Sequence, residues 1–334
     1  MTLGVLALFV LMAYGQEKKF ALYSVAFYNM ENLFDTIHDE GKNDYEYLPN
    51  GTNQWNTMKY KAKLKNMSEI LSLLSTDKLP MGPAIIGVSE IENYRVLEDI
   101  LKQPALADRG YQYVHYEGED QRGVDCAFFY NPKLFELTNS KLVPYVYIND
   151  TVHKTRGFLI ASGNIAGEKM HFIVNHWPSR AAASPARERA GEQVRAIKDS
   201  LLREDSAAKI VIMGDMNDDP MDKSMAVALG AKRKPADVGP TDLYNPWWDT
   251  LKKGYGTLMY KGKWNLFDQI VFTGNLLGTD RSTLKFYKHE IFRRDFMFQK
   301  EGKYKGYPKR TQAGGVWLNG YSDHLPTIIY LIKE

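Results

Sequence analysis

Short apolar runs recur along the chain, and polar residues follow most of them. Runs of this length, rich in Val, Ile, Phe and Tyr, are typical of buried β-strands. The predicted strands span residues 20–28, 84–88, 126–130, 158–161, 171–174, 209–213, 267–272 and 327–332.

Two longer segments instead carry apolar residues at the three- and four-residue spacing of an amphipathic helix. They span residues 58–74 and 187–202. Strands and helices are interleaved after residue 20 without a long linker, a low-complexity tract or an internal repeat. We therefore predict a single α/β domain over residues 16–334.

The start of the chain has a different pattern. Residues 3–14 form an uncharged, mostly apolar run, which as a helix is too short to cross the ~30 Å hydrocarbon core of a bilayer. The small residues Ala13 and Gly15 then precede polar sequence that begins at Gln16, as at a signal-peptide cleavage site, although the usual basic start is missing. We predict that residues 1–15 are a signal peptide and that the mature chain is exported, to the periplasm or outside the cell. A buried N-terminal helix or strand is the alternative.

Composition narrows the class of protein. Of the residues, 44% are hydrophobic and 25% are charged, which argues against disorder and coiled coil. The net charge of +3 is too small for a protein that coats nucleic acid, so any basic binding surface must be local. The single cysteine, Cys126, excludes an intramolecular disulfide and a Cys-rich zinc site. Its apolar neighbours favour a buried core thiol over a reactive one.

Polar residues at the ends of the predicted strands are the candidates for chemistry, because a strand end can hold a side chain rigidly in a cleft. Each such residue alone also has an ordinary explanation, as a turn former, a helix cap or a loop histidine. The pattern as a whole is more informative than any member. These positions carry Asn29, Glu31, Glu90, Asn175, His176, Asp215, Asn217, Asp268, Asp323 and His324.

These residues lie in short motifs that occur in a recognisable order. The motifs are Tyr-Asn-Met-Glu-Asn-Leu-Phe-Asp at 28–35, Val-Ser-Glu-Ile-Glu at 88–92, Arg-Gly-Val-Asp at 122–125, Asn-His-Trp-Pro-Ser-Arg at 175–180, Gly-Asp-Met-Asn-Asp at 214–218, Phe-Asp-Gln-Ile at 267–270 and Ser-Asp-His at 322–324. On these motifs the chain resembles the endonuclease/exonuclease/phosphatase superfamily, the deoxyribonuclease-like metal phosphoesterases. The resemblance implies a four-layer α/β sandwich, in which two packed mixed β-sheets are flanked by helices and the site lies at one edge.

The resemblance also implies a metal site. It makes Glu90 the principal metal ligand, with Asn29, Glu31 and Asp323 completing or bordering the metal shell. A hard divalent cation neutralises the phosphate that would otherwise repel an attacking hydroxide, and it prefers oxygen ligands. The predicted cofactor is therefore Mg²⁺, with Mn²⁺ as an alternative, and no His/Cys cluster with zinc spacing competes.

The implied catalytic residues surround that site. Asp215 would hold the attacking water and accept its proton, while Asn217, on the same face of an extended segment, would donate a hydrogen bond to a phosphate oxygen. His324, paired with Asp268, would stabilise charge on the phosphate, because a nearby carboxylate favours the imidazolium. His176 is a second donor on the phosphate side. Whether Asp215 or an Asp-paired histidine is the general base stays open, and we favour Asp215.

Substrate contacts are less strongly indicated. Arg180 follows the His176 motif and is predicted to contact phosphate, whereas Arg122 and Asp125 are either site-adjacent or an internal pair that orders their loop. Residues 285–310 hold nine Lys or Arg and three acidic residues among several aromatics. Such a segment suits a phosphate backbone with bases stacked nearby, although the aromatics could equally belong to the core.

The predicted function is an exported, Mg²⁺-dependent phosphoesterase that cleaves phosphodiester bonds by attack of water, and a nuclease is favoured. The alternative is a phosphodiesterase or phosphatase acting on a lipid, inositol or sugar phosphate. A non-catalytic phosphate-binding module is less favoured, because binding alone does not need the whole set of polar residues. The sequence indicates no stable membrane anchor and no protein partner.

Overall fold

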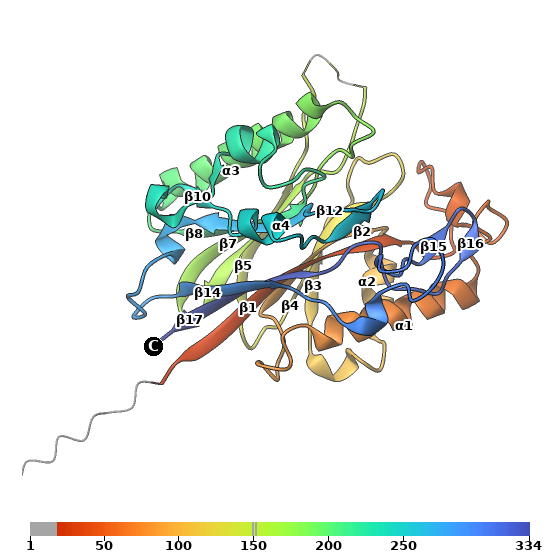
Figure 1. The fold of residues 1–334 in the computed structure, drawn as a ribbon, viewed down its shortest axis with the longest axis horizontal. Helices are drawn as coiled ribbons and strands as arrows, with labels where there is room; N and C mark the ends of the chain where they lie inside the picture. The colour runs from red at the N-terminus through yellow and green to blue at the C-terminus, as the bar shows by residue number, and fades with distance from the viewer. Residues whose placement is uncertain (1–18, 149, 151) are drawn as a thin grey trace, which may run out of the picture.

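Two large β-sheets packed face to face form the centre of the molecule (Figure 1). The computed structural model describes residues 19–148, 150 and 152–334. The predicted signal peptide, residues 1–15, lies outside the described residues. No helix among the residues that the structure describes has the length and apolar character needed to cross a membrane.

The first sheet has six strands in the order β14-β17-β1-β2-β4-β3. It is mixed, because β1 runs parallel to β2 and antiparallel to β17, and β2 runs antiparallel to β4. Its strands are β1 (Ala21–Leu33), β2 (Ile85–Ile91), β3 (Gln112–His115), β4 (Asp125–Tyr130), β14 (Lys285–Ile291) and β17 (Thr327–Lys333).

The second sheet has seven strands in the order β5-β6-β7-β8-β13-β10-β9. It too is mixed, because β7 runs parallel to β8 while β13 runs antiparallel to β8. Its strands are β5 (Glu136–Val143), β6 (Phe158–Ile165), β7 (Glu168–His176), β8 (Lys209–Asp215), β9 (Ala231–Lys232), β10 (Leu243–Tyr244) and β13 (Asp268–Thr273).

Helices and small hairpins complete the fold. The α-helices are α1 (Thr57–Leu73), α2 (Tyr94–Leu101), α3 (Ser184–Glu204) and α4 (Trp248–Lys252), and Ser224–Leu229 forms a π-helical turn. Two-stranded hairpins are formed by β11 (Leu258–Tyr260) with β12 (Lys263–Asn265), and by β15 (Gln312–Ala313) with β16 (Val316–Trp317). Short 3₁₀ turns lie at Tyr45–Tyr47, Ala107–Arg109, Pro235–Asp237, Gly274–Leu276 and Asp295–Met297.

The alternation of side chains along β1 divides the core into layers. Ala26 and Tyr28 face a cluster that includes Leu64 of α1, whereas Val25 and Phe27 face the other sheet. A third cluster packs α3 on the outer face of the second sheet. The order of layers is therefore helices α1 and α2, sheet, sheet, helix α3, which confirms the predicted four-layer sandwich (Figure 1).

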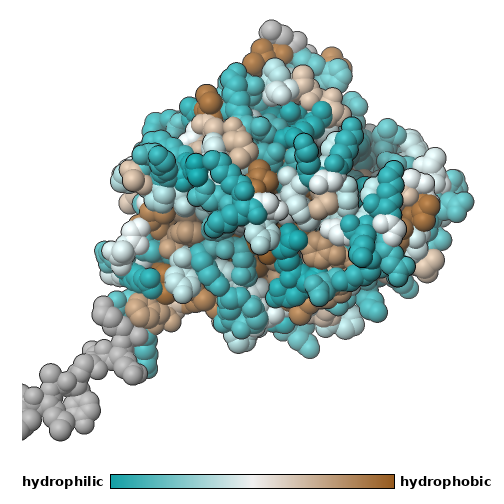
Figure 2. Space-filling view, in the orientation of Figure 1, coloured by the Kyte–Doolittle hydropathy of each residue, from teal (hydrophilic) through white to brown (hydrophobic). Residues whose placement is uncertain are grey.

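The two sheets approach each other closely at Gly87 of β2. A Cβ atom at this position would lie 2.5 Å from the sulfur of Met213 and 3.0 Å from a methyl carbon of Val174. Both contacts come from the facing sheet, so only glycine fits without displacing them. Hydrophilic residues cover most of the face shown in Figure 2, and the hydrophobic ones there lie in small separate groups.

The strands and helices predicted from periodicity all form, and β1 and β6 continue to Leu33 and Ile165, beyond their predicted ends at residues 28 and 161. Helix α1 begins where Asn56 accepts a hydrogen bond from the backbone N–H of Lys59, and α3 has a proline in its first turn. Cys126 is buried, and its burial raises the thiol pKa, as a core position requires. The unpredicted elements β5 and β14 lie half exposed at sheet edges, where apolar residues are too few to reveal a strand.

Candidate active site

The ends of five strands from both sheets bring the predicted polar residues to one edge of the sandwich. Asp215, the last residue of β8, lies opposite both His176 of β7 and Asp268 of β13 in the strand register. Asn29 of β1 and Glu90 of β2 approach from the first sheet. At this edge, Asp215 of the second sheet contacts Asn29 of the first.

Irregular backbone aims these side chains at the cleft. The register shifts between Asn29 and Leu33 in the β1–β2 pair and again between Ser89 and Ile91 in the β2–β4 pair. Four residues here adopt the left-handed backbone region that favours glycine, and such conformations cost about 1–2 kcal/mol each. They are Glu31 (φ +45°), Asn32 (φ +54°), Glu90 (φ +58°) and Asn217 (φ +50°).

A first cluster forms around the carboxylates of Glu90 and Asp215. The side-chain amide of Asn29 donates to Glu90 Oε1 (3.0 Å) and to Asp215 Oδ2 (2.9 Å), while its oxygen accepts the backbone N–H of Glu31 (2.8 Å). His176 Nε2 lies 3.6 Å from Glu90 Oε1 and 3.8 Å from Asp215 Oδ2. Asn29 thus holds the two carboxylates together through its side-chain N–H groups. Its side-chain oxygen accepts from Glu31, so in this arrangement that oxygen is not directed to a cation between the carboxylates.

The donor atoms of this cluster fit a divalent cation. One ligand atom each from Glu90, His176 and Asp215 lies within 4.8 Å of the others. Burial and the nearby Arg156 and Arg122 hold the pKa of His176 well below its usual value, so its ring is neutral and can act as a ligand. Two carboxylates this close repel each other in a buried site, and a hard cation with oxygen ligands would relieve that repulsion.

A second cluster pairs Asp268 with His324. His324 Nδ1 lies 2.7 Å from Asp268 Oδ2, and its Nε2 lies 3.8 Å from Asp215 Oδ2. Although burial opposes the charged ring, Asp268 and Asp215 raise the pKa of His324 well above its usual value. Burial raises the pKa of Asp215 to about 7, and His324 opposes that rise. Asp215 therefore belongs to both clusters and lies between Glu90 and a charged imidazole.

The loop that carries His324 is fixed to the first sheet. The backbone N–H of His324 donates to Ser322 Oγ (3.1 Å), and Ser322 Oγ donates to the carbonyl oxygen of Asn29 (2.8 Å). Leu258 of β11 forms a β-bridge with His324 on the other side. The serine of the Ser-Asp-His motif thus positions the histidine.

Asn217 lies beside Asp215 as predicted. Its backbone N–H donates to Asp215 Oδ1 (2.9 Å), and its side-chain amide donates to the carbonyl oxygen of Trp177 (3.0 Å). The amide therefore ties the tip of β8 to the loop after β7, and its proposed hydrogen bond to phosphate stays a prediction.

Glu31 and Asp323, predicted at the border of the metal shell, are bridged by Arg310. Arg310 Nε lies 2.8 Å from Glu31 Oε1, and Nη2 lies 2.9 Å from Asp323 Oδ2. The backbone N–H of Thr311 donates to Glu31 Oε2 (2.7 Å). Among the described residues, neither Glu31 nor Asp323 belongs to a cluster of three ligand groups. They border the Glu90 cluster and do not converge on it.

Lys63 is a site residue that the sequence analysis missed. It is fully buried in α1 and lies 3.9 Å from Glu31 Oε2, while its ammonium donates to Thr311 Oγ1 and to the carbonyl oxygen of Tyr321 (2.8 Å). Burial raises the pKa of Glu31 and lowers that of Lys63. A lysine within the apolar stripe of a predicted helix is the signal that could have revealed it.

The predicted substrate residues lie nearby but have protein partners. Arg180 contacts Asp222 (2.7 Å) and Asp219 (3.3 Å) and lies over the ring of Phe267. The expected alternative, an Arg122–Asp125 pair, does not form. Arg122 lies 3.6 Å from Asp120.

Asp125 instead orders its own loop. It accepts the backbone N–H of Gly118 (3.0 Å) and contacts His115 Nε2 (3.2 Å). Position 125 lies next to Glu90 in the sheet, since it pairs with Ile91 across β2 and β4. Contact between substrate and Arg180, Arg122 or Asp125 therefore stays a prediction.

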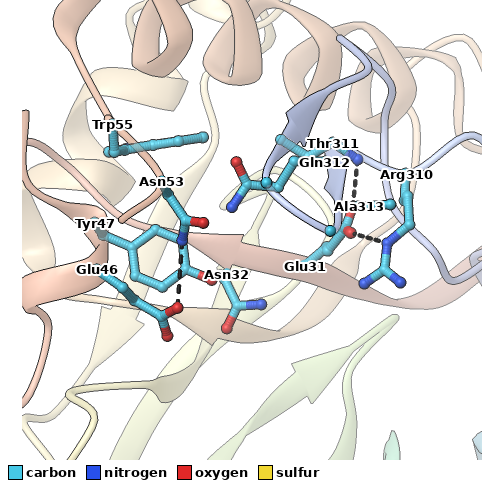
Figure 3. Close-up of a pocket in the computed structure, with 12 residues that line it drawn as sticks. Glu31, Asn32, Glu46, Tyr47, Asn53, Trp55, Arg310, Thr311, Gln312 and Ala313 are labelled. Carbon is cyan, nitrogen blue, oxygen red and sulfur yellow. Dashed lines mark hydrogen bonds and ion pairs between the residues drawn. The ribbon is translucent and has the colours of Figure 1, made fainter. Parts of the chain in front are cut away.

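Two pockets flank Arg310. The polar pocket, of about 170 Å³, is shown in Figure 3 and is lined by Glu31, Asn32, Glu46, Tyr47, Asn53, Trp55 and Arg310 to Gly315. The tyrosine pocket, of about 760 Å³, is lined chiefly by Leu258, Met259, Tyr260, Tyr304, Tyr307, Pro308 and Leu318, with Arg310 and Asp323 at its edge. Arg310, Ala313 and Gly314 line both pockets.

The basic, aromatic segment 285–310 is therefore divided in its role. Its first part forms the edge strand β14, and Phe292 is buried in the core. Its last part, from Gln299 onward, lines the tyrosine pocket beside Asp323. The first half therefore contributes to the core, and contact between the second half and a phosphate backbone stays a prediction.

Comparison with known proteins agrees with this geometry. A family model described as "Endonuclease/Exonuclease/phosphatase family" matches residues 24–333. A search of curated proteins finds no match. Solved structures with the same fold include an endonuclease/exonuclease/phosphatase family protein from Bacteroides thetaiotaomicron, which is 15% identical with a TM-score of 0.59 and covers 95% of this chain and 96% of its own.

Two further structures carry more specific names. A mannosyl-6-phosphatase from Bacteroides thetaiotaomicron is 14% identical with a TM-score of 0.57, over 92% of this chain and 99% of its own. TDP2 from D. rerio, complexed with a single-strand DNA product, is 15% identical with a TM-score of 0.54, over 93% of this chain and 99% of its own. At this identity the structures show a shared fold only. Since the family model spans nearly the whole described chain, the resemblance drawn from the motifs is confirmed, and the chain belongs to the endonuclease/exonuclease/phosphatase family.

Proposed function

We propose that this protein is an exported, Mg²⁺-dependent phosphodiesterase that cleaves nucleic acid by attack of water. The observation that carries the proposal is the position of Asp215, which lies between the Glu90–His176 cluster and the Asp268–His324 pair. A carboxylate beside both a cation site and a charged imidazole can serve as the general base for phosphoryl transfer to water, with both neighbours stabilising the charge that develops.

Glu90, with His176 beside it, would hold the divalent cation next to Asp215. The cation would supply charge neutralisation and polarisation of the phosphoryl oxygen. Asp215 orients the attacking water and accepts its proton. His324 Nε2 is 3.8 Å from Asp215 Oδ2, which is too far for a direct hydrogen bond, so an oxygen of water or phosphate can contact both.

The remaining residues of the site hold these groups in place. Asp268 orients His324 and favours its charged form, which can donate a hydrogen bond to the phosphate. Asn29 keeps the carboxylates of Glu90 and Asp215 together before substrate binds. Asn217 fixes the loop that follows β7. Each contact is made without substrate, so the site is preorganised.

Two observations support a diester and nucleic acid. The phosphorus of a diester carries two organic groups, and two pockets lie on either side of Arg310. The tyrosine pocket offers the rings of Tyr260, Tyr304 and Tyr307 close to Asp323, and such rings suit stacking against a base. The crystal structure of TDP2 from D. rerio, a neighbour in fold, is a complex with a single-strand DNA product, which is consistent with this substrate class.

A substrate panel with the mature chain tests the proposal. Single-stranded DNA, RNA, a chromogenic phosphodiester, a chromogenic phosphomonoester and sphingomyelin should each be assayed with Mg²⁺ and with chelator. We expect cleavage of the diesters that stops with chelator and returns with Mg²⁺. Turnover that persists in chelator would overturn the metal requirement, and hydrolysis of the monoester or the lipid alone would overturn the nuclease assignment.

Export needs a separate measurement. Full-length protein should be produced in a bacterium with a signal peptidase, and the mature N-terminus should be determined by mass spectrometry. We expect the periplasmic or secreted chain to begin at Gln16. An intact N-terminus on protein confined to the cytoplasm would contradict the export proposal.

A further inference from the structure

The polar pocket has the volume of a single small ring. Its volume is about 170 Å³, and an engineered protein cavity of about 150 Å³ holds one benzene ring. The pocket is built from three parts of the chain, namely the end of β1, the loop from Glu46 to Trp55, and the segment from Arg310 to Gly315. The catalytic arrangement proposed above places no ligand in contact with these three parts.

Three side-chain amides line this pocket, beside the carboxylates of Glu31 and Glu46 and the guanidinium of Arg310. Asn32, Asn53 and Gln312 line it, together with the carboxylate of Glu46 (Figure 3). Asn53 donates to Glu46 (3.3 Å). The amides of Asn32 and Gln312 have no hydrogen-bond partner among the residues that the structure describes. An amide both donates and accepts, as a hydroxyl does, so these groups match a ligand that carries several hydroxyls.

Other ligand classes fit this lining less well. A second phosphate would face the carboxylates of Glu31 and Glu46, and Arg310, the cation in the wall, already bridges Glu31 and Asp323. An acyl chain would leave the amides of Asn32 and Gln312 without partners. A ring with hydroxyls satisfies the amides and still packs against Tyr47.

The walls of the pocket are held rigidly before any ligand binds. The indole N–H of Trp55 donates to the carbonyl oxygen of Phe34 (2.9 Å), and Tyr47 stacks on the ring of Phe34 at 4.1 Å. Trp317 of β16 packs edge-on against Trp55, with ring centroids 5.8 Å apart. The β15–β16 hairpin is thus fixed to the loop from Glu46 to Trp55. Rigid walls of this kind reduce the entropy that is lost when a ligand binds.

Hydrogen bonds connect the polar pocket to the reaction centre. The backbone N–H of Asn32 donates to Glu90 Oε2 (3.0 Å). Glu31 and Arg310, which form another wall, reach Asp323. A ring in the pocket would therefore lie beside Asn32, whose backbone contacts Glu90, the residue proposed to hold the cation.

We propose that the polar pocket binds a sugar ring esterified to the scissile phosphate, and that Asn32, Asn53 and Gln312 recognise its hydroxyls. This inference rests on the proposed phosphoesterase function and names a determinant of its specificity. The sugar can come from two sources with the same chemistry, the ribose of an RNA chain or a free hexose phosphate. Deoxyribose, which lacks the 2′-hydroxyl, is a poorer ligand in either case.

Steady-state kinetics on four substrates tests the proposal. They are an RNA oligonucleotide, the DNA oligonucleotide of the same sequence, mannose 6-phosphate and bis(p-nitrophenyl) phosphate, which has no hydroxyls. For the preferred sugar-bearing substrate, we expect Gln312→Leu and Asn53→Leu each to raise KM about tenfold, which corresponds to about 1.4 kcal/mol. The kcat/KM for bis(p-nitrophenyl) phosphate should stay within twofold of wild type.

Gln103→Leu is the matched control, because Gln103 follows helix α2 and lines neither pocket. It should leave the preference for the hydroxylated substrate unchanged. A preference for RNA over DNA identifies ribose as the sugar, and turnover of mannose 6-phosphate alone identifies a hexose. Equal kcat/KM on RNA and DNA with no turnover of mannose 6-phosphate would overturn the proposal, and so would an equal loss on all substrates in Gln312→Leu.

A binding measurement separates this proposal from the function on which it rests. Wild type and Gln312→Leu are titrated by calorimetry with mannose 6-phosphate, ribose 5-phosphate and inorganic phosphate. We expect wild type to bind at least one sugar phosphate about tenfold more tightly than phosphate, and Gln312→Leu to lose that difference. Equal affinities in wild type would refute the sugar pocket, whereas sugar binding without hydrolysis of any substrate would refute the phosphoesterase function alone.

Discussion

His324 Nδ1 and Asp268 Oδ2 lie 2.7 Å apart, both buried, and the other nitrogen of His324 faces Asp215. The aspartate opens β13 of the second sheet, whereas the histidine precedes β17 of the first. This pair thus connects the two sheets, and substitution of either residue should change the chemistry of the site.

Replacing Asp268 with Asn is expected to lower the pKa of His324, because Asp268 is the first of the groups that raise it. The charged imidazole would then be lost at lower pH, so the alkaline limb of the kcat profile should move to lower pH. We also expect kcat near neutral pH to fall about 10²-fold. The measurement is kcat against pH for both proteins, with Asp280→Asn, at an exposed turn, as control. An unchanged alkaline limb would contradict the role of Asp268.

Asp215→Asn and His324→Ala are each expected to lower turnover by at least about 10²-fold while the fold stays intact, since both groups act on the reacting atoms. Circular dichroism and thermal unfolding check the fold, and single-turnover kinetics measures the chemical step. Near-normal turnover in either variant would show that its role has been wrongly assigned.

Divalent metal is expected to stabilise the protein as well as activate it, because a ligand of the folded state alone stabilises by about 2.7 kcal/mol at a concentration 100 times its Kd. We expect Mg²⁺ to raise Tm, chelator to reverse the rise, and Glu90→Gln to abolish it. Differential scanning calorimetry gives the answer without an activity assay. Glu136→Gln, at the exposed edge strand β5, is the matched control and should keep the full Mg²⁺ response.

Lys63→Met is expected to destabilise the protein by about 1–3 kcal/mol, because it removes a donor from the carbonyl oxygen of Tyr321 and leaves the buried carboxylate of Glu31 with Arg310 as its one cationic partner among the described residues. The double variant Lys63→Met with Glu31→Gln should recover part of the loss, since the carboxylate that lost its lysine partner is then also removed. Urea unfolding of the three proteins measures both effects. A single variant as stable as wild type would show that Arg310 alone compensates Glu31.

His289 provides a pH-dependent contribution to stability away from the site. Burial lowers its pKa to about 4, whereas the unfolded chain has a value of about 6.5. Between these two pH values the unfolded state therefore binds more protons than the folded state. The contribution of His289 to stability is fully present above pH 6.5 and declines as the pH falls towards 4. Through His289, the wild-type protein should lose about 2 kcal/mol of stability between pH 7 and pH 4.5. His289→Gln should not show this loss. Urea unfolding at pH 7 and pH 4.5 tests this, and equal pH dependence in both proteins would contradict it.

Much of the site could be predicted because its residues occupy strand ends. Glu90, His176, Asp215, Asp268 and His324 all come from motifs beside apolar runs, and the structure brings them together. The partners of Arg122 and Arg180 could not be predicted in the same way. Their contacts are with loop carboxylates, and loops carry no periodic pattern that places one residue opposite another.

The sequence by itself determined the buried core strands, the two long helices, the family and most of the residues around Asp215, because alternation and helical spacing are local properties of the chain. The tertiary structure alone decided that Arg310 bridges Glu31 and Asp323, that Lys63 is buried beside them, and that two pockets lie on either side. Glu31 and Arg310 are 279 positions apart. Contacts over such separations depend on how layers and loops pack, and no local pattern of residues encodes that packing.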